Sequence, residues 1–306
     1  MKKILSLLSF FFILSFLSSA QLDINHDQLT TRNTDTIMGW DFGGKFKLDL
    51  SQVGMVNWSK GGDNSLTGIA NLNLFLNYIS EDFRWTNLFE VGYGAQRIGK
   101  KFSKAEDRLQ FTSKIGKNAS EKWYYTGLVD FKTQMVAGYN SDDEDLKISD
   151  WMAPGYLFLS LGMDYIPNEK LSIFLSPVTY RSTFVLDQAL SDSGSFGVDP
   201  GEKVRHELGA YIKFFYKHEI MKNVTFQTNL DLFSNYLENP QNIDVDWRVL
   251  LDMKVNNFLS ASISTHLIYD DDIKFKYDSN GDGDLDGSGA RVQFKEIIAV
   301  GLALEF

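Results

Sequence analysis

The chain has 306 residues, a net charge of −10 and no cysteine. The acidic balance, 40 acidic against 30 basic side chains, argues against nucleic acid as a partner, because phosphate binding needs a surplus of Lys and Arg. Without cysteine the protein has neither disulfides nor a lipid-modified cysteine, so its stability must come from backbone pairing or a core.

The N-terminal segment has the pattern of an export signal. Lys2 and Lys3 precede an apolar run over residues 4–17, and the small residues SSA follow shortly afterwards. Such an arrangement is typical of a signal peptide, and the run is shorter than the roughly 20 residues of a membrane-spanning helix. We therefore predict a signal peptide at 1–20 cleaved near Ala20, a periplasmic N-terminal segment at 21–38, and a folded domain at 39–306.

From residue 39 onward, apolar and polar residues alternate over many segments. Within residues 66–78, Leu72 and Leu74 share one face, while Asn71 and Asn73 share the other. A period of two indicates a strand with one apolar and one polar face. Twelve such segments are predicted, at residues 39–51, 65–79, 83–97, 107–116, 122–137, 153–166, 170–185, 204–217, 223–237, 243–255, 258–270 and 291–306.

The lengths of these segments and of their connections indicate a membrane barrel. Several segments exceed the roughly 9–11 residues of a membrane-spanning strand, whereas soluble strands usually have about five or six. Short connections alternate with longer ones, which are predicted at 52–64, 98–106, 138–152, 186–203, 238–242 and 271–290. Such alternation is typical of outer-membrane barrels. We predict an all-β fold, a transmembrane antiparallel up-and-down β-barrel of about 12 strands, rather than a secreted soluble sandwich.

The last predicted strand ends in an aromatic residue, Phe306. A terminal Phe on an alternating strand resembles the signal by which bacterial outer-membrane barrels are recognised by their insertion machinery. We therefore expect an outer-membrane protein of a Gram-negative bacterium. Its expected partners are the outer-membrane lipids and, through the strand ending at Phe306, the insertion machinery.

Three stretches carry a family resemblance: residues 39–68, 175–210 and 291–306. The first contains an Asn-Trp pair at 57–58 followed by Gly61, Gly62 and Asn64. Together they resemble the outer-membrane barrel family called domain of unknown function 3078, found in Bacteroidetes-type bacteria. The resemblance implies the fold and the location. It brings no activity and no functional residues.

In a barrel, the polar faces of the strands would point into the lumen. The predicted lumen-lining residues are Lys45, Lys47, Arg84, Glu90, Arg108, Asp130, Lys132, Glu207, Lys213, Asp231, Arg248 and Asp252, with Asp49, Lys114, Asp246 and Lys254 as further candidates. Eight strands give a filled interior and sixteen or more an aqueous channel, so twelve fall between. The lumen is then either a narrow polar conduit for a small solute or a salt-bridged plug that stabilises the barrel.

A barrel with such a lumen is compatible with three functions. The first is a porin-like channel or small-solute transporter through a polar lumen; the alternative is a plugged structural or surface-interaction barrel. The third, an outer-membrane lipid hydrolase, would use His266 with Ser262 or Ser264. The sequence has no G-x-S-x-G motif beside them, so we expect no enzyme and assign no catalytic residue.

Two loops carry apolar residues that are costly in water. Loop 186–203 contains Leu190, Phe196 and Val198, and residues 53–64 include Trp58. We predict that these loops meet and cap the barrel, with packing on the rim as the alternative.

One acidic loop, DSNGDGDLDGSG at 278–289, resembles a calcium-binding loop. Oxygen-bearing side chains occupy its alternate positions, at Asp278, Asn280, Asp282, Asp284 and Asp286. Its twelfth position is Gly289 instead of the bidentate Glu, and its flanks alternate as strands do. We expect an Asp/Gly-rich surface turn, with a weak Ca²⁺ site as the alternative, and no other cofactor.

Overall fold

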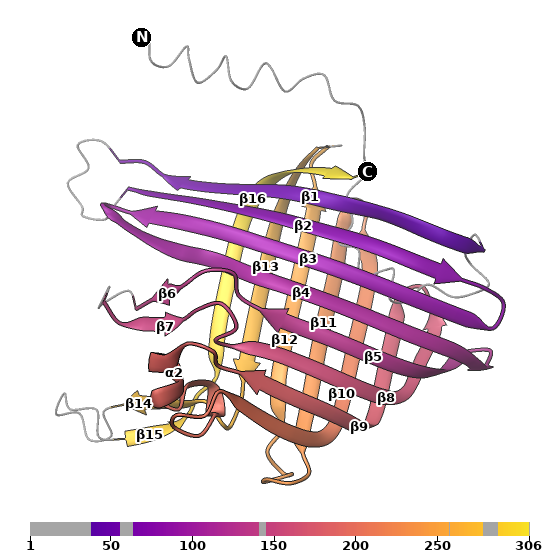
Figure 1. Cartoon of the computed structure of the whole chain (residues 1–306). Helices are drawn as coiled ribbons and strands as arrows, with labels where there is room; N and C mark the ends of the chain where they lie inside the picture. The colour runs from indigo at the N-terminus through magenta and orange to yellow at the C-terminus, as the bar shows by residue number, and fades with distance from the viewer. Residues whose placement is uncertain (1–37, 56–63, 141–144, 257, 278–286, 306) are drawn as a thin grey trace.

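A computed structural model describes residues 38–55, 64–140, 145–256, 258–277 and 287–305, and shows a single barrel (Figure 1). Five predictions concern residues that lie outside these ranges, apart from Met38: the signal peptide, the N-terminal segment at 21–38, the Trp58 segment, the loop from Asp278 to Asp286, and Phe306. The twelve barrel strands are β1 (Gly39–Val53), β2 (Ser65–Ile79), β3 (Phe83–Ile98), β4 (Lys101–Ser120), β5 (Trp123–Thr133), β8 (Gly155–Asn168), β9 (Leu171–Phe184), β10 (Val204–Met221), β11 (Val224–Asn235), β12 (Asp244–Lys254), β13 (Leu259–Tyr269) and β16 (Gln293–Glu305).

Each barrel strand pairs antiparallel with the barrel strands that come before and after it in the chain. Strand β16 pairs with β1, and this pairing closes the cylinder. The closing register runs from Lys45 opposite Glu305 to Leu50 opposite Val300. Closure satisfies the backbone hydrogen bonds that an open sheet would leave at its edges, which is the condition for strands in a bilayer. The predicted up-and-down barrel of about 12 strands is confirmed.

Five short turns, which connect β2–β3, β4–β5, β8–β9, β10–β11 and β12–β13, define the short-turn end of the barrel. The opposite, long-loop end carries additional small elements. These are the pair β6 (Gly138–Tyr139) and β7 (Lys147–Ser149), helix α2 (Gln188–Asp192), the 3-10 turn η2 (Ser195–Gly197), and the pair β14 (Lys274–Tyr277) and β15 (Gly287–Ala290). In Figure 1 they gather at one end of the cylinder.

The predicted long loop at 98–106 is wrong. Strand β4 begins at Lys101, so only two residues turn the chain, and Gly99 supplies the positive φ of 60° that this turn uses. Cross-strand contacts extend the hairpin: the Gln96 amide donates to the Ser103 hydroxyl at 3.0 Å, and the Arg97 guanidinium lies 5.3 Å from the Phe102 ring centre. The hairpin of β3 and β4 therefore lengthens the barrel wall instead of ending in a loop.

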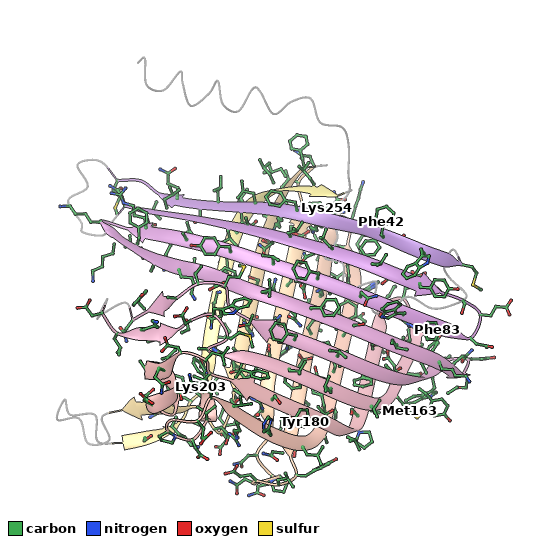
Figure 2. All side chains as sticks on the ribbon, in the orientation of Figure 1. Phe42, Phe83, Met163, Tyr180, Lys203 and Lys254 are labelled. Atoms are coloured by element: carbon green, nitrogen blue, oxygen red, sulfur yellow. The ribbon has the colours of Figure 1, made fainter. Side chains whose placement is uncertain are left out.

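The outer face of the barrel is apolar. Side chains cover it along the strands (Figure 2), and large ones such as Phe42 and Leu161 are 79% and 68% exposed. Near the short-turn end, the Trp40 ring lies 5.2 Å from Tyr78 and 6.0 Å from Trp85. An exposed apolar face with aromatic rings near its border is what a bilayer requires of a barrel. No helix in the described ranges is long and apolar enough to span a membrane.

Candidate functional site: a charged cavity inside the barrel

The interior of the barrel is divided into two parts. One arc of the wall, β5 and β8 to β11, directs five buried side chains into a mostly aromatic cluster: Leu128, Phe158, Phe174, Tyr211 and Phe233. The predicted polar lumen therefore also has an apolar part. The physical reason is that these inward-facing side chains pack against one another and exclude water from that arc.

The remaining arc encloses a cavity of about 540 Å³. Its walls come mainly from β1 to β5, β11 to β13 and β16, which are consecutive in the barrel. Its lining also includes Gln134 and Pro154, which lie just beyond β5 and just before β8, so it extends toward the long-loop end. Cavities that hold small ligands usually measure about 300–1,000 Å³.

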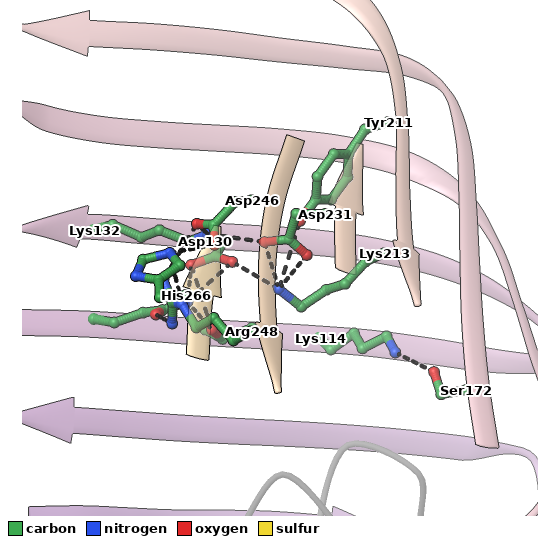
Figure 3. Close-up of polar contacts among 12 residues, drawn as sticks. Lys114, Asp130, Lys132, Ser172, Tyr211, Lys213, Asp231, Asp246, Arg248 and His266 are labelled. Carbon is green, nitrogen blue, oxygen red and sulfur yellow. Dashed lines mark hydrogen bonds and ion pairs between the residues drawn. The ribbon is translucent and has the colours of Figure 1, made fainter. Parts of the chain in front are cut away.

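A network of ion pairs crosses the interior beside the cavity (Figure 3). The Lys132 ammonium on β5 lies 2.8 Å from Asp231 on β11 and 3.5 Å from Asp246 on β12. Lys213 on β10 lies 3.1 Å from Asp231 and 3.3 Å from Asp130 on β5. Because three strands of the wall lie between β5 and β11, these contacts connect strands that are not neighbours in the sheet.

Side chains also fill the interior closer to the short-turn end. Lys114 forms an ion pair with Asp164 and donates a hydrogen bond of 3.2 Å to Ser172. The buried Arg84 guanidinium lies 5.3 Å from the centre of the Tyr124 ring. Side chains from β3, β4, β8 and β9 therefore occupy the interior at this level of the barrel.

A second charged cluster, centred on Arg181, lies toward the long-loop end. The Arg181 guanidinium contacts Asp244, lies 2.9 Å from Asp270 and lies 3.3 Å from Glu207. Arg181 was not among the predicted lumen residues, because a register shift in the pairing of β8 with β9 changes which residues face inward. Pro177 is the signal that could have revealed it, since proline within a strand marks an edge or a bulge.

The loop at 186–203 packs on the rim of the barrel. Leu190 and Val198 are buried against Ala153 and Val185, which explains why these apolar residues occur in a loop. The loop also reaches the segment after β13, because Arg205 donates to the Gly197 carbonyl at 3.3 Å and pairs with Asp272 at 2.6 Å. The predicted contact with residues 53–64 stays a prediction, because 56–63 lie outside the described ranges.

An ion-pair triad attaches this loop to the β6–β7 hairpin, outside the barrel wall. The Lys147 ammonium lies 2.7 Å from Asp150 and 2.7 Å from Asp187, which also caps α2 by accepting from the Leu190 amide. Hydrogen bonds from Lys147 lower the pKa of both carboxyls. The same bonds, first the one to Asp150 and then the one to Asp187, raise the pKa of Lys147.

All twelve predicted lumen residues lie on barrel strands, but in two different environments. Six line the cavity: Lys45, Lys47, Glu90, Arg108, Lys132 and Arg248. The other six lie elsewhere in the interior, buried or nearly so: Arg84, Asp130, Glu207, Lys213, Asp231 and Asp252. The further candidates Asp49 and Asp246 also line the cavity. Four charged residues of the lining were not among the predicted lumen residues: Lys104, Glu106, Asp107 and Lys295.

The residues considered for a hydrolase line the cavity, but the hydrogen bonds of Ser262 and His266 are with other residues. The His266 Nε2 atom lies 2.8 Å from a carboxylate oxygen of Asp246 and 3.4 Å from the Nε atom of Arg248. The Ser262 hydroxyl accepts a hydrogen bond of 2.9 Å from Lys47. Within the part of the chain that the structure describes, neither serine contacts His266.

Three carboxylates near the rim, Asp244, Asp270 and Asp272, lie within 4.8 Å of one another and could in principle hold a cation. Arg181 and Arg205 already contact this group. The predicted calcium loop itself lies outside the described residues; its flanks, β14 and β15, pair as an antiparallel hairpin with Tyr277 opposite Gly287.

A closed antiparallel barrel with an apolar outer face and a partly charged interior belongs to the class of transmembrane β-barrels found in outer membranes. Residues 50–139 match the family model described as "Protein of unknown function (DUF3078)", which confirms the family resemblance over that part of the chain. No curated protein matches the chain.

Among solved structures, similar folds include three barrels. The COG4313 outer membrane channel from Pseudomonas putida F1 has a TM-score of 0.41 and 11% identity, covering 94% of this chain and 100% of that one. The translocator domain of autotransporter NalP from Neisseria meningitidis has a TM-score of 0.37 and 10% identity, and the match covers 87% of this chain and 89% of that one. The NanC porin has a TM-score of 0.36 and 9% identity, and the match covers 84% of this chain and 98% of that one. Because these scores and identities are low, the function proposed below rests on the cavity.

Proposed function

We propose that this barrel passes small polar solutes across the outer membrane through the cavity-bearing arc of its lumen. The observation that carries the proposal is the cavity of about 540 Å³, lined by charged and polar side chains within a closed membrane barrel. A barrel wall that served stability alone gains nothing from a charged cavity, because buried charges are costly to desolvate. The signal peptide at 1–20 and location in the outer membrane are parts of this proposal.

The experiment is single-channel recording of the purified barrel in a planar bilayer. The proposal expects small, discrete conductance steps. It further expects the double variant Lys132→Ser/Asp231→Ser to conduct more, because it removes both members of an ion pair that crosses the interior and leaves Lys213 paired with Asp130 at 3.3 Å. Lys122→Ser, at an exposed position in the β4–β5 turn, is the control and should conduct as the wild type does.

The second candidate is a plugged structural or surface-interaction barrel. It is favoured by the aromatic cluster and by the ion pairs that span the interior. Absence of conductance steps in both the wild type and the double variant, with both barrels folded, would support it and reject the channel.

A further inference from the structure

The charge of the cavity differs in sign from that of the chain. Over the whole chain acidic residues outnumber basic ones, 40 to 30. Among the residues that line the cavity the order is reversed, with seven basic side chains (Lys45, Lys47, Lys104, Arg108, Lys132, Arg248 and Lys295) against five acidic ones (Asp49, Glu90, Glu106, Asp107 and Asp246). A positive cavity in an acidic protein selects for negative solutes, because low-dielectric walls focus its field.

Two of the basic side chains and a histidine form a row across neighbouring strands. Arg248 on β12 is directly opposite His266 on β13, which is directly opposite Lys295 on β16. All three line the cavity. The row gathers N–H donors from three strands on one wall of the cavity, where Asp246 pairs with Arg248 at 3.2 Å and lies 2.8 Å from the His266 Nε2 atom.

Two members of the row, Lys295 and Arg248, contact the part of β4 that contains Arg108. The Lys295 ammonium pairs with Glu106 and donates to the Ala105 carbonyl at 3.0 Å, although four strand-to-strand steps separate β16 from β4. One nitrogen of Arg248 lies 3.5 Å from the Gln110 side-chain oxygen, also on β4. Arg108, between Glu106 and Gln110 on this strand, therefore lies in the region that Arg248 and Lys295 both reach.

The guanidinium of Arg108 has capacity for a further acceptor. Its ion pair with Glu90 is 3.8 Å long, beyond hydrogen-bonding distance, and its Nε has no hydrogen-bond partner among the described residues. A guanidinium presents five N–H donors in a planar fork that matches a carboxylate or phosphate group. The lining nonetheless includes apolar surface, such as Ile69, Ile268 and Ile297, which suits the carbon skeleton of an organic anion.

We propose that the cavity is a binding site for a small organic anion, whose carboxylate or phosphate group lies between Arg108, Arg248 and Lys295. This rests on the proposed function and specifies its substrate class: the barrel binds and passes small anions in preference to neutral or cationic solutes of similar size. Arg108 provides the bidentate contact, and Arg248 and Lys295 add charge from the opposite wall.

The test is calorimetric titration of the detergent-solubilised barrel with succinate, with inorganic phosphate and, as a neutral probe, with glucose. We expect binding of at least one of the two anions at a stoichiometry of one. Arg108→Gln and Lys295→Gln should each weaken it at least tenfold, the effect of losing one charge-assisted hydrogen bond. The control, Lys122→Gln, removes an exposed positive charge outside the cavity and should bind as the wild type does.

A second variant separates a direct contact from a change in net charge. Arg108→Gln/Glu90→Gln keeps the net charge of the cavity, so direct contact predicts the same loss as in Arg108→Gln alone, whereas a general field predicts recovery. Recovery would overturn the role given to Arg108. Failure of both anions to bind the folded wild type, or equal binding in all cavity variants, would overturn the site.

Reversal potentials in a KCl gradient separate this inference from the proposed function. We expect chloride preference in the wild type and a shift toward potassium in Arg108→Gln. Anion binding without any conductance would reject the channel and retain the site. Conductance with potassium preference, together with absence of anion binding, would retain the channel and reject the site.

Discussion

At the scale of single residues, buried charges in this barrel are held by several partners at once. Arg181 contacts three carboxylates and also lies 5.2 Å from the centre of the Phe233 ring, with its side chain only 7% exposed. Such a residue cannot be replaced without leaving uncompensated negative charge. Removing one partner of a buried ion pair costs more than the pair itself contributes, because the remaining charge stays desolvated.

We therefore predict that Arg181→Met lowers the free energy of unfolding by about 3–5 kcal/mol. Equilibrium urea unfolding in phospholipid vesicles measures this change. Arg181→Lys keeps the charge but not the planar fork and should lose less. A loss below about 1 kcal/mol in Arg181→Met would mean that water enters the cluster and solvates its carboxylates.

The Lys147 triad outside the barrel wall predicts a response to pH. The pKa values of Asp150 and Asp187 are lowered in the folded protein, so their stabilisation is present above the ordinary value of 3.8 and lost as the pH falls through the lowered values. The pKa of Lys147 is raised, so its stabilisation is present below 10.5 and lost as the pH rises through the raised value. The attachment of α2 to β7 is thus firm between these limits.

A spin label at position 189 can follow this attachment, because the chain has no cysteine and Ala189→Cys provides a single, exposed site. We expect low label mobility at neutral pH and higher mobility at both extremes. In the Lys147→Gln background the mobility should be high throughout. Equal mobility with and without Lys147 at neutral pH would contradict the role of the triad.

At the scale of elements, register shifts decide which side chains enter the lumen. The pairing of β8 with β9 shifts between Leu161 and Met163, and that of β9 with β10 shifts between Gly209 and Tyr211. The intervening Gly162 lies so close to β9 that a Cβ atom would overlap the Leu175 carbonyl. Glycine is required there because the two backbones approach more closely than a side chain permits.

Gly162→Ala should therefore lower the free energy of unfolding by about 1–3 kcal/mol through backbone displacement. Gly127→Ala on the adjacent strand β5 is a matched control, since its Cβ would meet the Leu161 side chain at an ordinary 3.6 Å. Vesicle-based unfolding of both variants tests the comparison. Equal stabilities of the two would show that the β8–β9 pair adjusts without cost.

At the scale of the whole molecule, the barrel separates two solvents. Val129 on β5 and Leu159 on β8 are opposite each other in the register, and both are exposed on the outer face, near the middle of their strands. Their neighbours along the strands, such as Asp130 and Ser160, are buried inside. The alternation along each strand therefore directs apolar side chains toward the lipid and polar side chains toward the lumen.

This arrangement predicts a cost that depends on depth in the bilayer. Val129→Arg, near the middle of its strand, should lower the free energy of unfolding by about 2–4 kcal/mol. Leu66→Arg, on the outer face at the long-loop end of β2, should lower it by roughly 0–1 kcal/mol. Unfolding from vesicles compares the two, and equal losses would place the bilayer elsewhere along the strands.

The sequence by itself determined the barrel, because a period of two repeated over strands of this length has one solution in a bilayer. It identified the twelve strands and the inward positions of Lys45, Lys132 and Arg248, since alternation assigns a face to each residue locally. It did not identify Arg181 or the continuous β3–β4 hairpin, because a bulge or an extended hairpin is set by pairing with another strand.

Only the tertiary structure decided how the lumen is filled. The aromatic cluster, the ion pairs across the interior and the cavity all depend on contacts between strands far apart in the chain, such as Lys132 with Asp231. Alternation gives the direction of a side chain but not the partner that it meets across the barrel. The row of Arg248, His266 and Lys295 is therefore a property of the closed cylinder, because only strand pairing brings these three residues side by side.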